Sequence, residues 1–234
     1  SLSLSLSLSL SADHTYTHNS HTNTEKILTI QIMEHNGSGI VAMCGKNCVG
    51  IASDTRLGAG PQTVSCEFKK VFKVHDKLYY GLAGLGTDVQ TMSEKLEFRM
   101  NMYELRENRK IKPSTFGNVL CNMLYSKRFG PYFAEPVVAG LEGKENKPFI
   151  TAMDLIGAPV FTDDFLVAGT CSDNLYGTCE SLYQADMDPE TLFETLSQAL
   201  LAAVDRDALS GWGATVTIIT PTETFTRQLQ ARMD

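Results

Sequence analysis

The sequence predicts an α+β fold with four layers, an αββα sandwich in which two packed antiparallel sheets are flanked by helices. Three observations predict it. Segments typical of strands and helices follow one another in blocks, as strands, two helices, strands, two helices and strands. The helical blocks carry apolar stripes, which are typical of helices that lie on a sheet. Finally, 43% of the 234 residues are hydrophobic, which is enough for a large core.

We interpret residues 1–32 as a low-complexity, disordered extension that precedes one domain at residues 33–234. Five Ser-Leu repeats are followed by a polar run without a helical or strand period. His14, His18 and His21 have the spacing of one helical face and could hold a metal. The Thr and Asn residues around them disfavour a helix, so we expect solvated histidines and no metal site.

The first two strands are predicted by short apolar runs at residues 40–44 and 48–52. A Gly-Lys-Asn link separates them, and a link of that length with Gly and Asn is typical of a tight β-hairpin. Ser38 precedes the first run and Asp54 follows the second. Because hairpin strands are antiparallel, we expect this hydroxyl and this carboxylate near the same rim of the sheet.

The next elements are predicted by periodicity and by Gly and Pro. After the hairpin we expect a turn at residues 75–77 and strands at residues 63–68, 71–74 and 78–83. A helix then follows, with an apolar stripe at Val89, Met92, Leu96, Met100 and Tyr103. Pro113 begins a second helix, which Gly130 and Pro131 end.

The last part of the chain is predicted to supply the second sheet and its helices. Four short strands are expected at residues 137–141, 149–153, 159–161 and 165–169. Asp188 and Pro189 begin a long apolar helix, because both residue types favour helix N-termini. Two strands complete the chain, at residues 214–220 and 225–229.

Gly84 and Gly86 lie between a predicted strand and a predicted helix, and they raise the alternative of a phosphate-binding loop. The dinucleotide pattern would need glycine at Val89, and no Gly-Lys-Ser/Thr follows. We therefore expect close packing of strand and helix at this point, and no cofactor.

Composition argues against several classes of function. A net charge of −7 disfavours a nucleic-acid surface, which needs clustered Lys and Arg. No run approaches the roughly 18 apolar residues of a membrane-spanning helix, so we expect no membrane partner. Six cysteines, mostly inside apolar runs, are typical of reduced, buried thiols, and we expect the protein in the cytoplasm and nucleus.

Several ordered motifs resemble one known family, the proteasome beta subunits, which are N-terminal nucleophile hydrolases. The opening stretch, residues 37–56, resembles the start of their mature chain. Further matching motifs are FKKVF (68–72), GLAG (81–84), KRFGPY (127–132), FETLSQA (193–199) and VDRDALSG (204–211). The resemblance covers residues 33–234 and implies the same αββα sandwich.

The resemblance also implies a set of pocket residues. The catalytic threonine of the family falls on Ser38, which follows Gly37. The other positions of the pocket fall on Asp54, Lys70, Thr170, Asp207 and Ser210. We expect Arg206 as a further charged partner in this region.

The pocket is expected to be vestigial, with no catalytic residue. An N-terminal nucleophile needs the free α-amine of its own residue as base. Ser38 replaces threonine, Cys171 and Ser172 alter the neighbouring loop, and no extended propeptide is evident. Asp54, Lys70 and Asp207 are then an inherited buried charge cluster. The alternative is an active endopeptidase that uses Ser38 after cleavage of the Gly37–Ser38 bond.

The resemblance therefore implies a non-catalytic, structural beta subunit of the 20S proteasome core, required for assembly of the beta ring in a complex that degrades ubiquitinated proteins. Its partners would be other alpha and beta subunits in a stacked-ring hetero-oligomer. Asp154 aligns with a position that reaches into the substrate pocket of the neighbouring subunit. The alternative for Asp154 is a turn aspartate that caps nearby backbone N–H groups.

Overall fold

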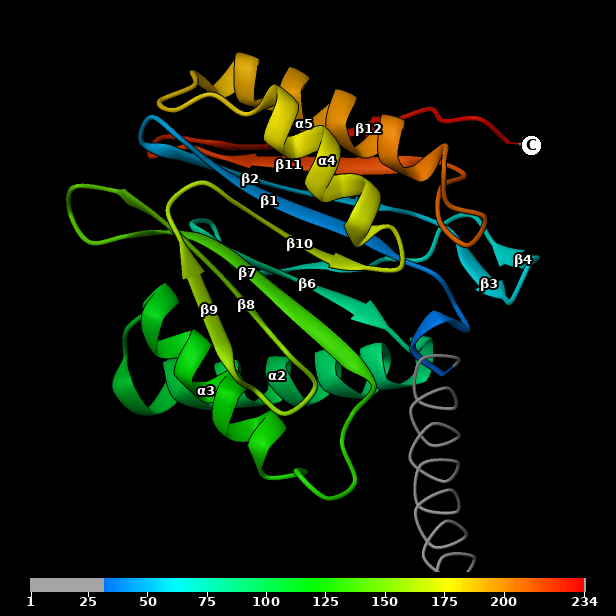
Figure 1. Ribbon diagram of the computed structural model, residues 1–234. Coiled ribbons are helices and arrows are strands. Elements are labelled where there is room, and N and C mark those ends of the chain that lie inside the picture. Colours follow the sequence, from blue (N-terminus) through cyan, green and yellow to red (C-terminus); the bar gives the residue numbers. More distant parts are fainter. Residues whose placement is uncertain (1–31, 234) are drawn as a thin grey trace, which may run out of the picture. The chain divides into compact units, whose positions relative to one another are not determined.

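Two five-stranded antiparallel sheets pack face to face at the centre of the computed structural model (Figure 1). The first sheet contains, in spatial order, β10 (Phe165–Gly169), β1 (Gly39–Gly45), β2 (Cys48–Asp54), β11 (Ala214–Ile219) and β12 (Thr224–Leu229). The second contains β5 (Val71–His75), β6 (Leu78–Gly84), β7 (Ala134–Glu142), β8 (Lys147–Met153) and β9 (Pro159–Thr162).

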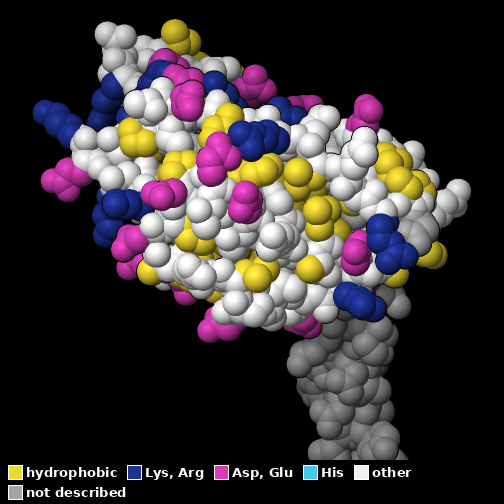
Figure 2. All heavy atoms as spheres, turned by 90° about the horizontal axis from the view of Figure 1, so that it is seen from above, with side chains coloured by type: hydrophobic (Ala, Val, Ile, Leu, Met, Phe, Trp, Pro, Cys, Tyr) yellow, Lys and Arg dark blue, Asp and Glu magenta, His cyan; other side chains and the backbone are white. Residues whose placement is uncertain are grey.

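Helices cover the outer face of each sheet (Figure 1). The second sheet carries α2 (Gly86–Glu107) and α3 (Pro113–Tyr125), and the first carries α4 (Ser172–Leu182) and α5 (Pro189–Val204). The predicted αββα sandwich is confirmed. Figure 2 shows that the face of the molecule on the side of α4 and α5 mixes apolar, acidic and basic side chains.

The structure describes residues 32–233, and the compact unit begins at Met33. The extension predicted at residues 1–32, with its three histidines, lies outside the described residues except for Ile32. Within residues 32–233, no helix is long and apolar enough to cross a membrane. All six cysteines are free thiols.

The first hairpin forms as predicted. Gly45 pairs with Cys48, which leaves Lys46 and Asn47 as a two-residue turn, and Asn47 adopts a φ of 54°. Every residue of β1 and β2 is buried, because one face of the sheet packs on helices and the other on the second sheet. This burial on both faces explains why both segments are continuous apolar runs.

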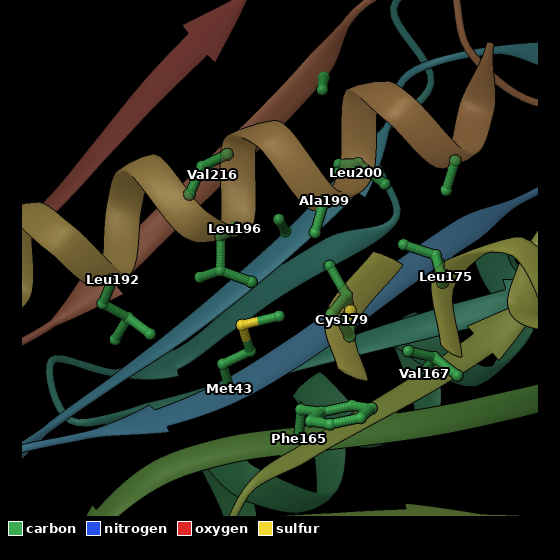
Figure 3. Close-up of a cluster of buried hydrophobic side chains, with 14 of the residues drawn as sticks. Met43, Phe165, Val167, Leu175, Cys179, Leu192, Leu196, Ala199, Leu200 and Val216 are labelled. Carbon is green, nitrogen blue, oxygen red and sulfur yellow. The ribbon is translucent and has the colours of Figure 1, made fainter. Parts of the chain in front are cut away.

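Side chains of β1 alternate between two cores. Met43 points toward the helices, where it lies in one cluster with Phe165, Leu196 and Cys179 (Figure 3). Ile40 points the other way, into the core between the two sheets. A third core lies between the second sheet and its two helices, with Leu82, Met92, Phe116 and Leu120.

Three local predictions need correction. The strand expected at residues 63–68 is shorter, β4 (Gln62–Ser65), and pairs with β3 (Leu57–Ala59), which is too short to show a period. The second helix ends at Tyr125, not at Gly130, because Ser126 Oγ donates to Met123 O at 2.6 Å and the following residues form turns. The strand at residues 165–169, expected in the second sheet, is β10, which pairs with β1 in the first sheet.

Candidate functional site

Ser38 lies immediately before β1 and is buried. Its backbone N–H donates to Thr170 Oγ1 at 3.2 Å, and its carbonyl oxygen lies 3.1 Å from the same hydroxyl. The Ser38 hydroxyl itself is buried and has no hydrogen-bond partner among the described residues. The nitrogen that would act as base in an N-terminal nucleophile is therefore a hydrogen-bonded peptide amide in this chain.

Lys70 and Asp54 form a buried ion pair beside Ser38. Lys70 Nζ lies 2.6 Å from Asp54 Oδ1, and their side chains are 2% and 0% exposed. Nζ also donates to the carbonyl oxygen of Gly37 at 3.1 Å. Asp54 accepts the N–H of Gly39 at Oδ1 (2.9 Å) and the N–H of Gly211 at Oδ2 (3.1 Å). The pair thus connects the start of β1, the end of β2 and the turn after α5.

Asp207 belongs to a separate group, which reaches Ser38 through Thr170. Its Oδ2 accepts the hydroxyls of Thr170 and Ser210, both at 2.7 Å, and its Oδ1 accepts the N–H of Leu209 at 3.1 Å. Asp207 is only partly buried and makes no direct contact with Lys70. The single three-member charge cluster that we predicted is therefore two groups.

Arg56 is a site residue whose role sequence reasoning missed. Its guanidinium is buried and donates to the carbonyl oxygens of Leu209 and Gly60 and to Thr63 Oγ1. It therefore holds the segment after α5 against the β3–β4 hairpin. Arg206, the predicted charged partner, is exposed, and its side chain makes no hydrogen bond or ion pair within residues 32–233, so that prediction was wrong. The one feature of the sequence that could have indicated this role is the position of Arg56, two residues after Asp54.

The loop after β10 is tightly packed on the start of β1. A Cβ on Gly39 would overlap the sulfur of Cys171, and a Cβ on Gly169 would lie 2.7 Å from Ser38 Oγ. Gly169 also has a φ of 101°, which other residues rarely adopt. Burial, and then Asp54, raise the pKa of the Cys171 thiol to about 12. Cys171 is thus a neutral packing residue and not a nucleophile at neutral pH.

The turn between α5 and β11 is strained. Gly211, Trp212 and Gly213 have consecutive φ values of 120°, 59° and 126°. A bulky residue in the left-handed region is uncommon and costs about 1–3 kcal/mol. The geometry of this turn directs the N–H of Gly211 at Asp54 Oδ2.

Asp154 directly follows β8 and is exposed. Its Oδ1 accepts the backbone N–H groups of Ile156 at 3.1 Å and Ala158 at 2.7 Å. Its Oδ2 accepts no hydrogen bond within residues 32–233. Burial, and then the charge of Asp154, raise the pKa of the Glu135 carboxyl. One oxygen therefore caps the turn, while the other is available to a partner.

The alternative of a phosphate loop at Gly84 and Gly86 is wrong. The N–H of Gly86 donates to Asn36 Oδ1 at 2.7 Å, and the N–H of Leu85 donates to the carbonyl oxygen of Phe133 at 2.8 Å. These amides are the donors that a phosphate would need. The loop is instead a close crossing, because a Cβ on Gly84 would overlap the same Phe133 carbonyl.

Within residues 32–233, no group of three or more His, Cys, Asp or Glu side chains could hold a metal ion. The site therefore consists of two hydrogen-bonded groups and an internal serine.

Comparison with known proteins identifies related chains. A family model described as proteasome subunit matches residues 34–219. A relative from Picea mariana, proteasome subunit beta type-3, is 55% identical over 205 residues, which are 88% of this chain and 100% of that protein. Proteins of the same name from Dictyostelium discoideum and Drosophila melanogaster are 56% and 52% identical, with the same coverage.

Proposed function

The chain belongs to the proteasome subunit family, and from that premise we propose that it is a non-catalytic beta subunit of the 20S core particle. Its role is to complete a beta ring that stacks on a second beta ring and on an alpha ring. The assembled particle is the endopeptidase that degrades proteins, and this chain contributes structure. The partners of the chain are the other alpha and beta subunits.

One observation carries the non-catalytic role as long as the Gly37–Ser38 bond is intact: the nitrogen of Ser38 is then a peptide amide that donates to Thr170 Oγ1. An amide nitrogen has no useful basicity, so it cannot take the proton of the serine hydroxyl. The Ser38 hydroxyl also has no hydrogen-bond partner among the described residues that could act as a base in its place. Lys70, the other candidate, directs its ammonium group at Asp54 and Gly37.

The preserved hydrogen bonds have a structural role instead. They hold β1, β2 and the turn after α5 in one arrangement, through the contacts of Asp54 with Gly39 and Gly211. Loss of one charged partner would leave the other buried and unpaired, at a cost of about 3–5 kcal/mol. These side chains therefore stabilise the fold, although they take no part in catalysis.

The experiment is to purify the assembled particle through a tag on another subunit and to measure the intact mass of this chain. We expect a terminus before Ser38, no labelling by a covalent inhibitor of N-terminal nucleophiles, and unchanged peptidase activities in a particle with Ser38→Ala. A mature terminus at Ser38 together with labelling of its hydroxyl would establish the active-peptidase alternative.

The proposal includes a location in the cytoplasm and nucleus. Six free cysteines, four of them buried, support a reducing compartment. A fluorescent tag on this chain should overlap in both compartments with a tag on a catalytic subunit. Exclusion of this chain from the nucleus, while the catalytic subunit enters it, would contradict the proposal.

A further inference from the structure

The loop between α3 and β7, which Figure 1 shows at the end of α3, carries an exposed aromatic side chain. Phe129 is 98% exposed, the most exposed large hydrophobic side chain among the described residues. Tyr125, the last residue of α3, is 65% exposed. Burial of such a ring removes a large apolar surface from water, which is favourable. A partner that covers both rings would therefore gain substantial binding free energy.

Hydrogen bonds hold this loop in one conformation. The N–H groups of Lys127, Arg128 and Gly130 each donate to the carbonyl oxygen three residues earlier, all at 3.0 Å. Pro131 follows and restricts the backbone further. The aromatic rings are thus presented on a turn that continues α3, so little conformational entropy remains to be lost on binding.

Both ends of the loop are anchored to the body of the domain. At its start, Met123 and Leu124 are buried in the core beneath α3. At its end, Tyr132 accepts a hydrogen bond from Lys95 of α2 at 2.7 Å, and the N–H of Phe133 donates to Asp88 Oδ2 at 2.8 Å. The exposed segment between these anchors is therefore a projection of defined position.

Two cationic residues directly precede Phe129 in the chain. Lys127 and Arg128 are exposed, and within residues 32–233 neither has a carboxylate within ion-pair distance. The guanidinium carbon of Arg128 lies 5.3 Å from the centre of the Phe129 ring. On a chain with a net charge of −7, this is a local positive site. A partner surface that carries Asp or Glu carboxylates would be electrostatically complementary to it.

We propose that these four residues, Tyr125, Lys127, Arg128 and Phe129, form an aromatic knob that inserts into an apolar pocket on an adjacent subunit of the particle. The rim of that pocket carries Asp or Glu side chains that pair with Lys127 and Arg128. The inference rests on the proposed function, because it needs an assembly. Aromatic and Arg side chains dominate the binding energy of protein interfaces, and a preformed projection suits a permanent contact.

A photo-crosslinking residue tests the contact directly. Phe129 is replaced by p-benzoylphenylalanine, the assembled particle is purified through a tag on another subunit, and crosslinked peptides are identified after illumination. We expect one dominant crosslink to another subunit, at apolar residues with Asp or Glu beside them. A knob that crosslinks only to a protein outside the particle, or to nothing, would overturn the inference.

Competition between wild-type and variant chains for incorporation into particles measures how strongly the knob contributes to assembly. Wild-type and variant chains with different tags are expressed together, and their ratio in assembled particles is determined. We expect Phe129→Ala to lower incorporation at least fivefold and the double charge reversal Lys127→Glu with Arg128→Glu to lower it further. Phe98→Ala is the matched control, because Phe98 is also an exposed ring (66%) but lies on α2 outside the knob. Its incorporation should change less than twofold.

The outcomes separate this inference from the proposed function. If the wild-type chain is absent from purified particles, the proposed function fails. If the wild-type chain is present and Phe129→Ala enters particles equally well, only the knob is refuted. Misfolding does not confuse the result, because the Phe129 side chain is outside the core, and circular dichroism of the variant should match that of the wild type.

Discussion

The ammonium of Lys70 lies 2.6 Å from Oδ1 of Asp54, with both side chains almost completely removed from water. These residues are sixteen positions apart in sequence: Asp54 ends β2 of the first sheet, and Lys70 directly precedes β5 of the second. The ion pair therefore joins the two sheets at the edge where Ser38 lies. Its main energetic consequence appears when one partner is lost.

Asp54→Asn should lower the free energy of unfolding by about 3–5 kcal/mol, because it leaves the Lys70 ammonium buried without its counter-charge. Urea unfolding followed by the fluorescence of Trp212, the one tryptophan of the chain, measures this. The double variant Asp54→Asn with Lys70→Met should lose less than the sum of the two single variants. Asp76→Asn, in an exposed ion pair, is the control and should be nearly neutral. Additive losses in the double variant would show that the pair is not coupled.

Gly37→Ala should destabilise the chain by about 3 kcal/mol or more, because the new Cβ would overlap the carbonyl oxygen of Leu209 and Gly37 has a φ of 68°. Gly60 offers a matched control. Its φ is 61°, but a Cβ there would meet open space, so Gly60→Ala should cost only the backbone strain, about 1–2 kcal/mol. Equal losses in the two variants would mean that steric overlap at Gly37 is relieved by small shifts.

His75 should make stability depend on pH. Its Nδ1 accepts the N–H of Lys77 at 3.2 Å, so its Nε2 carries the proton that it donates to Ile111 O at 2.9 Å. Burial lowers the pKa of His75 below its ordinary value of 6.5. The folded state thus favours neutral imidazole. The contribution of neutral His75 to the free energy of unfolding is complete above pH 6.5. It is lost as the pH falls from 6.5 through the lower pKa that His75 has in the folded state.

The measurement for His75 is the free energy of unfolding from pH 8 to pH 5 in the wild type and in His75→Gln. The glutamine does not titrate, so the wild type should lose more stability than the variant below about pH 6.5. Parallel pH profiles of the two proteins would rule out this role for His75.

Asp154→Asn should reduce cleavage after basic residues in the assembled particle, if Asp154 reaches the neighbouring substrate pocket. The amide oxygen of asparagine can still accept the N–H groups of Ile156 and Ala158, so the turn should remain while the charge is removed. Coulomb attraction of about 1 kcal/mol at about 4 Å in water predicts a loss of about fivefold. The assay compares basic, acidic and apolar peptide substrates. A uniform change, or none, would leave Asp154 with the capping role alone.

Several elements could be predicted from the sequence because their signals are local. The continuous apolar runs of β1 and β2 indicated strands buried on both faces. Pro113 and Pro189 correctly indicated the first residues of α3 and α5. The end of α3 was misjudged, because turns with bonds to the third preceding residue continue past Tyr125 and resemble helix in sequence.

The candidate site was predicted only in part. Position-by-position resemblance found all members of the two hydrogen-bonded groups around Ser38. It did not separate Asp207 from the Lys70–Asp54 pair. The sequence reading also expected a charged partner at Arg206, whereas the arginine that is buried at the site is Arg56. The local sequence around an arginine does not say whether its guanidinium points into the fold, because that depends on what packs over it.

The sequence by itself determined the fold class, the family and the identity of the pocket residues, since each depends on local periodicity or on motifs in order along the chain. Only the tertiary structure decided how those residues pair. The bond between Gly211 and Asp54 joins positions 157 residues apart, and the turn that aims it is strained at Trp212. Such contacts depend on strand register, sheet packing and loop closure together, and no local pattern encodes that combination.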